Sequence, residues 1–349
     1  MKLKSVLYFG SYDGNYSRNR IIKKGLIANG FNVVDNQASG RLPIRYFKLA
    51  IRFFKCQNKI SAIIVGFPGH YDVLLAFILG KLFGKKVFYD IFASTYETYV
   101  MDRELIKKNS LRAKFFYFID WVSIKIADYV IVDTIAHGKF YSQFYGSNLQ
   151  KQIVVYIGSD TDYFYPRKAR EETDVLFYGS YQPLQGVDMI IKAASKLPKV
   201  KFKLIGEGQT RRSAESQAKS LKLKNVEFAD WFPMEKLAEE ISKAKICLGI
   251  FGTTQKASVV IPNKVYDYLA SAKPVITSKT DASKELFKNG ENAILIPAGN
   301  YSTLAIAINN LTRDSKKRQE LSAIGYAYFK DALEAKSTVN YLISELMSI

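Results

Sequence analysis

Short apolar runs rich in β-branched residues alternate with helical patterns along the whole chain, and this alternation constrains the fold more than any other feature. It is typical of parallel sheets whose two faces are covered by helices. The strands predicted in the first half are 5–9, 31–34, 62–66, 86–90, 129–132 and 153–157. Those predicted in the second half are 174–178, 201–205, 226–228, 246–250, 274–277 and 293–296. The pattern predicts an α/β protein with doubly wound sheets.

Helical patterns fill the intervals between these strands, and the chain of 349 residues is long enough for two domains. Predicted helices of the first half lie near 17–29, 44–57, 72–84, 110–127 and 136–145. Those of the second half lie near 186–197, 210–222, 234–243, 263–272, 282–288, 302–313 and 315–345. The loop 158–172 is polar and contains Pro166, so we expect a domain of residues 1–165 and a second of residues 166–329.

The formal net charge of +19 is spread over both halves of the chain. Such a field attracts nucleic acid, anionic membranes or phosphorylated substrates. No known nucleic-acid-binding module surrounds the basic residues, which argues against nucleic acid. No apolar run approaches the roughly 20 residues that span a bilayer.

One predicted helix, with its flanks, carries cations at spacings of three and four and no acidic residue. These cations share one stripe, with apolar and aromatic residues beside it. One interpretation is an element that lies on an anionic membrane, and the other is a helix that packs on its sheet with solvated cations. A second basic cluster near residues 107–114 favours the membrane. The cations of the stripe are Arg41, Arg45, Lys48, Arg52, Lys55 and Lys59.

The segment 261–278 places a lysine and an acid beside a predicted strand. Pro262 suits the first turn of a helix, and Pro274 ends that helix before the strand. Lys264 and Asp267 lie at i and i+3, so they share a face. This arrangement suggests a nucleotide-sugar site.

Residues 267–276, Asp-Tyr-Leu-Ala-Ser-Ala-Lys-Pro-Val-Ile, resemble the most recognisable segment of the family 4 (group 1) retaining glycosyltransferases. Residues 158–166 resemble the domain linker of the same family. The resemblance implies the GT-B fold, in which two Rossmann-like, doubly wound domains face each other across a cleft. It implies an N-terminal acceptor-side domain, a C-terminal nucleotide-sugar domain, and a last helix, about 330–349, that packs back on the first domain.

Asp160 and Asp162 permit a second interpretation of the linker. An Asp-x-Asp pair after a strand also resembles the site that holds Mn²⁺ or Mg²⁺ in GT-A glycosyltransferases. Phe164 and Pro166 match the family 4 linker, and a second Rossmann-like pattern follows. We therefore expect no bound metal.

The predicted donor loops open helices with glycine turns, where backbone amides and the helix dipole favour phosphate. The family brings an arginine and a lysine to the donor diphosphate at positions that match Ser180 and Gln185. Both are neutral here, so the candidate replacement cations are Lys256, Lys264 and Arg18. The glycines that match the loops are Gly10, Gly179, Gly186, Gly206 and Gly208.

The family also carries two acids separated by seven residues. Asp267 matches the second, to which the resemblance assigns the donor ribose, and Val259 stands where the first would fall. Phe232 matches the loop beside the base and either stacks there or belongs to the core.

Two further residues are candidates near the reacting carbon. The family often has a histidine near Phe92, which is absent here, so Asp90 is the nearest polar candidate. Asp90 also fits a structural cap equally well. His70 lies at the carboxyl end of a predicted parallel strand, where open α/β sheets bind ligands.

These residues and the resemblance predict a retaining glycosyltransferase that uses a UDP-sugar or GDP-sugar without a cofactor. The expected acceptor is lipid-linked or a growing cell-surface glycan, and the expected location is cytoplasmic, at the inner face of the cell membrane. Two alternatives stay open: a GT-B sugar-nucleotide epimerase, and a catalytically degenerate membrane-associated binding protein.

Overall fold

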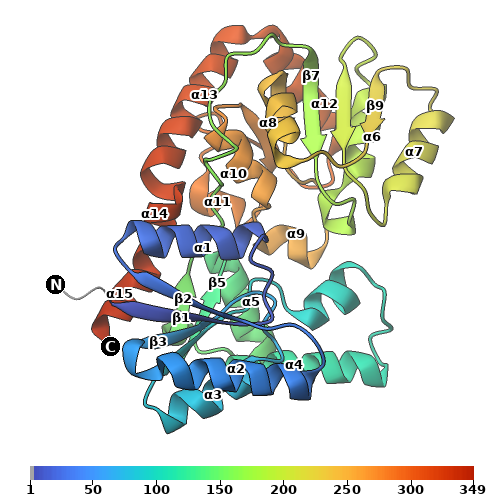
Figure 1. The fold of residues 1–349 in the computed structure, drawn as a ribbon. Helices are drawn as coiled ribbons and strands as arrows, with labels where there is room; N and C mark the ends of the chain where they lie inside the picture. Colours follow the sequence, from blue (N-terminus) through green and yellow to red (C-terminus); the bar gives the residue numbers. More distant parts are fainter. Residues whose placement is uncertain (1–3) are drawn as a thin grey trace. The chain divides into compact units, whose positions relative to one another are not determined.

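The computed structural model describes residues 4–349, which form two compact units (Figure 1). Unit 1 contains the chain up to Ile157 together with Ala335–Ile349, and unit 2 is Gly158–Glu334. The boundary expected at residue 165 therefore lies inside unit 2. The C-terminal segment of unit 1 begins at residue 335, a few residues after the expected start near 330.

Unit 1 is built on a six-stranded sheet with the order β2-β1-β3-β4-β5-β6. Neighbouring strands are parallel, and most of their residues are buried because helices cover both faces. The strands are β1 (Ser5–Gly10), β2 (Asn32–Gln37), β3 (Ala62–Val65), β4 (Lys86–Asp90), β5 (Tyr129–Val132) and β6 (Gln152–Val154).

Two groups of helices cover the faces of this sheet. Val339 and Leu342, from the C-terminal segment, pack with Leu26 and the strands in one core cluster. That face carries α1 (Ser17–Ala28), α14 (Ala335–Thr338) and α15 (Asn340–Ser348). Right-handed crossovers put the remaining helices on the other face. They are α2 (Leu42–Cys56), α3 (Val73–Leu82), α4 (Leu111–Ile126) and α5 (Ile135–Tyr145).

Unit 2 has a six-stranded parallel sheet with the order β12-β11-β10-β7-β8-β9. Its strands are β7 (Thr173–Tyr178), β8 (Phe202–Ile205), β9 (Val226–Ala229), β10 (Ala244–Leu248), β11 (Val275–Ser278) and β12 (Ile294–Ile296). Its helices are α6 (Val187–Ser195), α7 (Arg211–Ser220), α8 (Met234–Ser242), α9 (Gln255–Val259), α10 (Asn263–Ala270), α11 (Ser283–Leu286), α12 (Tyr301–Arg313) and α13 (Ser315–Tyr328).

Each predicted strand overlaps a strand of the structure, so the alternating pattern is confirmed. The single helix predicted over 315–345 is wrong. After α13 the chain forms a π-helical turn, η5 (Phe329–Leu333), and becomes extended at Glu334, where φ is −64° and ψ is 153°. The break falls where the chain leaves unit 2 and enters unit 1. Helix α9 and the π-helical turn η2 (Glu97–Asp102) were not predicted.

The inward face of α12 provides a test of the core of unit 2. Ile308 is fully buried in this core, whereas Ile306 on the same helix is 61% exposed. We expect Ile308→Ala to lower the free energy of unfolding of unit 2 by about 2–5 kcal/mol, because it leaves a cavity. Urea unfolding followed by Trp231 fluorescence, in a Trp121→Phe background, measures this loss. Ile306→Ala is the matched control, and equal losses in the two variants would contradict this packing.

Candidate functional site

The loops that follow β7 and β8 meet α10 at the carboxyl edge of the unit 2 sheet. Two glycines permit this close approach. At Gly179, where φ is +153°, an added Cβ would lie 2.7 Å from the Nζ atom of Lys264. At Gly206 an added Cβ would collide with the carbonyl oxygen of Gly179. The glycine turns thus bring backbone and a lysine together where open α/β sheets bind ligands.

Lys264 lies on α10 with only 3% of its surface exposed. Its ammonium group donates to the Oε1 atom of Gln185 and lies 3.8 Å from the centroid of the Phe177 ring. Burial lowers the pKa of Lys264 well below its usual range. The structure therefore places a cation directly beside the neutral Gln185, where the resemblance leads one to expect a lysine.

Asp267 lies one turn further along α10 and is also buried. Its carboxylate accepts hydrogen bonds from the hydroxyl groups of Ser159 and Tyr178. Burial, and next the charge of Asp267, raise the pKa of Tyr178 well above its usual range, so Tyr178 stays protonated. A buried carboxylate that receives hydroxyl groups has the chemistry needed to bind a sugar diol.

An aromatic residue that contacts Tyr178, the hydrogen-bond partner of Asp267, was missed by sequence reasoning. The rings of Tyr178 and Trp231 meet edge to face, with centroids 6.4 Å apart, and Trp231 is 47% exposed. Its neighbour Phe232, which the sequence singled out, instead contacts Lys236, with 4.6 Å between the ammonium and the ring centroid. Trp231 and Phe232 are adjacent in the sequence, but Trp231 contacts Tyr178 whereas Phe232 contacts Lys236.

The other residues predicted to bind the donor lie on several different elements of unit 2. Gln185 ends a 3-10 turn (Pro183–Gln185), and Gly186 is the N-cap of α6. Gly186 also lines a pocket of about 430 Å³ at the first turns of α6 and α7. Lys264 and Asp267 do not line that pocket. Lys256 is half-buried on α9, and Val259 is buried at the end of that helix. Ser180 and Gly208 belong to the loops after β7 and β8.

The carboxyl edge of the unit 1 sheet holds a buried ion pair. Arg18 on α1 and Asp90 at the end of β4 are both fully buried, with Nε and Oδ2 3.0 Å apart. Arg18 also donates to the carbonyl oxygen of Val155. This burial places the guanidinium of Arg18 in the core of unit 1. It also favours the structural interpretation of Asp90.

Gly10 is the last residue of β1, and His70 lies in the loop between β3 and α3. Gly10 has a φ of +123°, and an added Cβ would approach Asp72. Asp72 accepts from the amide of Ser11 at 2.8 Å, and so anchors the loop after β1. His70 Nδ1 is hydrogen-bonded to the hydroxyl of Tyr89 at 2.6 Å. The structure thus joins His70 to Tyr89, the neighbour of Asp90 in sequence.

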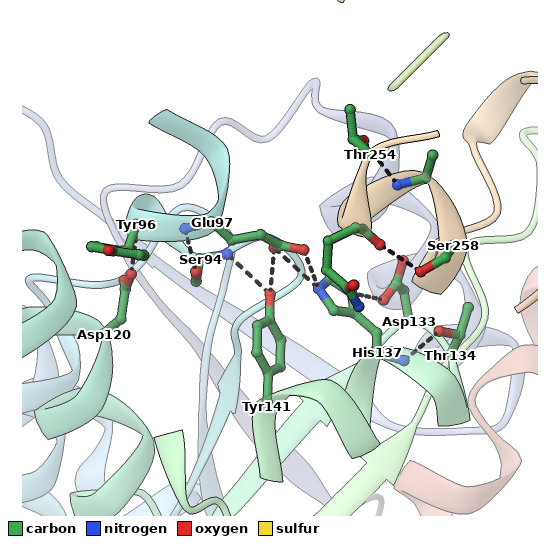
Figure 2. Close-up of polar contacts among 12 residues, drawn as sticks. Ser94, Tyr96, Glu97, Asp120, Asp133, Thr134, His137, Tyr141, Thr254 and Ser258 are labelled. Atoms are coloured by element: carbon green, nitrogen blue, oxygen red, sulfur yellow. Dashed lines mark hydrogen bonds and ion pairs between the residues drawn. The ribbon is translucent and has the colours of Figure 1, made fainter. Parts of the chain in front are cut away.

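A second polar network in unit 1 surrounds His137 (Figure 2). His137 Nδ1 lies 2.6 Å from Asp133, and Nε2 lies 3.1 Å from Glu97 of η2. All three side chains are buried. Burial alone lowers the pKa of His137, but Glu97 and Asp133 outweigh it and raise that pKa from 6.5 to about 9. The spacing of Asp133 and His137 by four residues at the start of α5 is a sequence signal that could have found this cluster.

Asp160 and Asp162, the two acids of the predicted linker, lie in a turn of unit 2. The carboxylate of Asp160 accepts the backbone amide of Asp162 at 3.3 Å, as in turns closed by an aspartate side chain. The backbone oxygen of Asp160 accepts the amides of Tyr163 and Phe164 at 3.0 Å. These contacts give Asp160 a structural role in the linker.

Comparison with known protein families and curated proteins gives two matches. Residues 159–328 match the model of the family described as glycosyl transferases group 1. A lipopolysaccharide core biosynthesis glycosyltransferase, LpsE of Rhizobium meliloti (strain 1021), is 22% identical over 153 residues. That match covers 44% of this chain and 43% of the relative, so it spans less than half of either protein.

Solved structures share the fold of almost the whole chain. Anabaena Alr3699/HepE in complex with UDP is 15% identical, with a TM-score of 0.72, and the match covers 99% of this chain and 100% of that one. The sucrose-phosphate synthase of Thermosynechococcus elongatus is 16% identical, with a TM-score of 0.74 and the same coverage. At such low identity these similarities establish the GT-B fold alone.

The His137 network predicts a pH dependence of the stability of unit 1. Because the pKa of His137 is raised on folding, its stabilising contribution is fully present below about pH 6.5 and is lost as the pH rises through about 9. We expect the stability difference between the wild type and His137→Gln to shrink over this range. Urea unfolding followed by Trp121 fluorescence, in a Trp231→Phe background, measures the difference. A difference that stays constant from pH 6 to pH 10 would contradict a protonated His137.

Proposed function

We propose that this chain, whose residues 159–328 match the family of glycosyl transferases group 1, transfers a sugar from a nucleotide diphosphate sugar to an acceptor, with retention of configuration and without a bound metal. The observation that carries this proposal is the buried Lys264 beside Gln185 and the glycine loops, one helical turn from the carboxylate of Asp267. The first group suits a diphosphate and the second suits a ribose diol.

The missing cations of the family pattern are compensated by Lys264. A buried ammonium group close to a phosphate regains the electrostatic stabilisation that it lost with its water. The pKa of Lys264 is lowered in the free protein, and a bound diphosphate would raise it again. Backbone amides at the start of α6 add further donors.

The proposed reaction is a same-face substitution at the anomeric carbon. The bond between that carbon and the diphosphate oxygen breaks, and the acceptor oxygen forms the new bond on the same face. The acceptor proton passes to the departing phosphate. Lys264 would stabilise the negative charge that develops on the diphosphate, which is the main contribution that a protein can make to this reaction.

The relatives indicate the class of each substrate. HepE was crystallised with UDP and with UDP-glucose, which favours a UDP-sugar over a GDP-sugar as donor here. LpsE acts in lipopolysaccharide core biosynthesis, which favours a glycan acceptor, lipid-linked or growing at the cell surface. The proposed location is cytoplasmic, at the inner face of the membrane. Asp90 and His70 stay candidates for the acceptor side.

Calorimetric titration with UDP, GDP and ADP, with and without Mg²⁺, tests donor binding. We expect micromolar binding of UDP that does not depend on Mg²⁺. Asp267→Ala should weaken UDP binding about tenfold to a hundredfold, because the buried hydrogen bonds of a charged group are lost. Asp331→Asn, at an exposed position, is the control.

Three outcomes separate the alternatives. No binding of any nucleotide to folded protein would overturn the transferase in favour of a degenerate binding protein. Unchanged affinity in Asp267→Ala would remove the role of Asp267. A GT-B epimerase would convert its sugar nucleotide without an acceptor, so analysis of the products distinguishes it from a transferase.

Lys264→Met separates diphosphate recognition from nucleoside recognition. We expect UDP affinity to fall at least tenfold, while uridine affinity changes less than twofold, because only the diphosphate contacts the ammonium group. Lys219→Met, at an exposed position of α7, is the control. Equal losses for UDP and uridine would show that Lys264 only supports the fold.

A further inference from the structure

Helices α2, α3 and α4 of unit 1 expose large apolar side chains in stripes. On α2 the exposed residues Ile44, Phe47, Ile51 and Phe54 follow one another at spacings of three and four. This stripe points away from the core, because Leu49 and Phe53 are the residues of α2 that are buried. The side chain of Phe47 is 68% exposed. The aromatic residues of the helix are therefore divided between the core and the outer surface.

The two neighbouring helices continue the same surface. The ring of Phe83, just after α3, lies 5.4 Å from Phe53 and 5.5 Å from Phe54 of α2, so α2 and the end of α3 are in contact. Helices α3 and α4 also pack side by side. The exposed apolar residues of these two helices are Leu74, Ile78, Leu82, Leu111, Phe115, Phe118 and Trp121.

The charges of this three-helix face have one sign. Helices α2 and α3 contain no acidic residue, and the one acid of α4, Asp120, is fully buried. Between residues 36 and 89 the sequence has a single acid, Asp72, which is also buried. The exposed cations of the face and its edges include Arg41, Lys48, Arg52, Lys55, Lys59, Lys81, Arg112, Lys114 and Lys125. Lys81 also lies 3.9 Å from Asp128, which follows α4.

Two cations of the predicted stripe have structural partners. The Nε atom of Arg45 lies 2.9 Å from Asp72, and this arginine is mostly buried. Arg52 donates to the carbonyl oxygen of Gln37. Asp72 in turn anchors the loop after β1, so Arg45 supports the sheet edge. The other four cations of the predicted stripe, Arg41, Lys48, Lys55 and Lys59, are exposed.

We propose that the three-helix face docks on a membrane that contains anionic lipids, with its apolar stripes inserted at the boundary between headgroups and acyl chains. Exposed apolar patches of this extent mark interaction sites. An anionic bilayer satisfies both features of the face, because lipid phosphates meet the cations and acyl chains receive the aliphatic and aromatic residues. A second copy of the chain would bring like charges together, and nucleic acid would leave the apolar stripes unsatisfied. Within residues 4–349 no helix is long and apolar enough to cross a bilayer.

This docking does not rest on the transferase activity, although it suits a lipid-linked acceptor. The test is sedimentation with vesicles of phosphatidylcholine alone or with about a third phosphatidylglycerol, without nucleotide. We expect binding that needs the anionic lipid and falls at least tenfold in a Phe47→Ser, Leu82→Ser variant and in a Lys48→Gln, Lys55→Gln variant. Ile306→Ser, on an exposed position of unit 2, is the control and should bind as the wild type does.

Trp121 provides a direct report of insertion. In a Trp231→Phe background it is the one tryptophan of the chain, and it lies on the three-helix face. Its emission should shift to shorter wavelength on anionic vesicles. Binding that the apolar variant leaves unchanged, or an unshifted emission, would overturn insertion. A dimer in solution that the same variant dissociates, or tighter binding to RNA than to vesicles, would overturn the membrane as the partner. Titration of the apolar and the basic variants with UDP tests the proposed function separately, so a loss of membrane binding can be distinguished from a loss of donor binding.

Discussion

Parallel strands can be joined only by crossovers that return over a face of the sheet, and this constraint determines where chemistry can occur in both units. The faces are occupied by helices, so the strands are buried and apolar. Polar loops gather at the carboxyl edges, where every strand of a sheet ends on the same side. The edge of unit 2 holds Lys264 and Asp267, and that of unit 1 holds the ion pair of Arg18 and Asp90.

The two edges bury charge in different ways. In unit 1 an arginine and an aspartate neutralise each other in the core, so the pair holds α1 to β4. In unit 2 the ammonium of Lys264 contacts an amide oxygen and an aromatic ring, and its burial lowers the pKa of Lys264. Burial of a cation on neutral partners costs free energy that a bound anion would recover. This difference makes the edge of unit 2 the better candidate for a diphosphate site.

The sequence predicted the strands well, because a buried parallel strand is a short apolar run between turns. It also selected Lys264 and Asp267, because their spacing places them on one face of a helix. The pairing of Arg18 with Asp90 could not be predicted, since the two are 72 residues apart and meet only through the strand order. Nor could the local sequence separate Trp231 from Phe232, or show that Arg45 is held by Asp72. Each of these depends on contacts between distant segments.

The measurement that tests the account most directly is a crystal structure of the protein with UDP. We predict that phosphate oxygens lie within hydrogen-bond distance of the Nζ atom of Lys264, that the side chain of Gln185 gives way, and that a ribose hydroxyl donates to Asp267. UDP bound in the pocket lined by Gln182 and Thr210, with the contact between Lys264 and Gln185 unchanged, would contradict the claim that Lys264 replaces the missing cations.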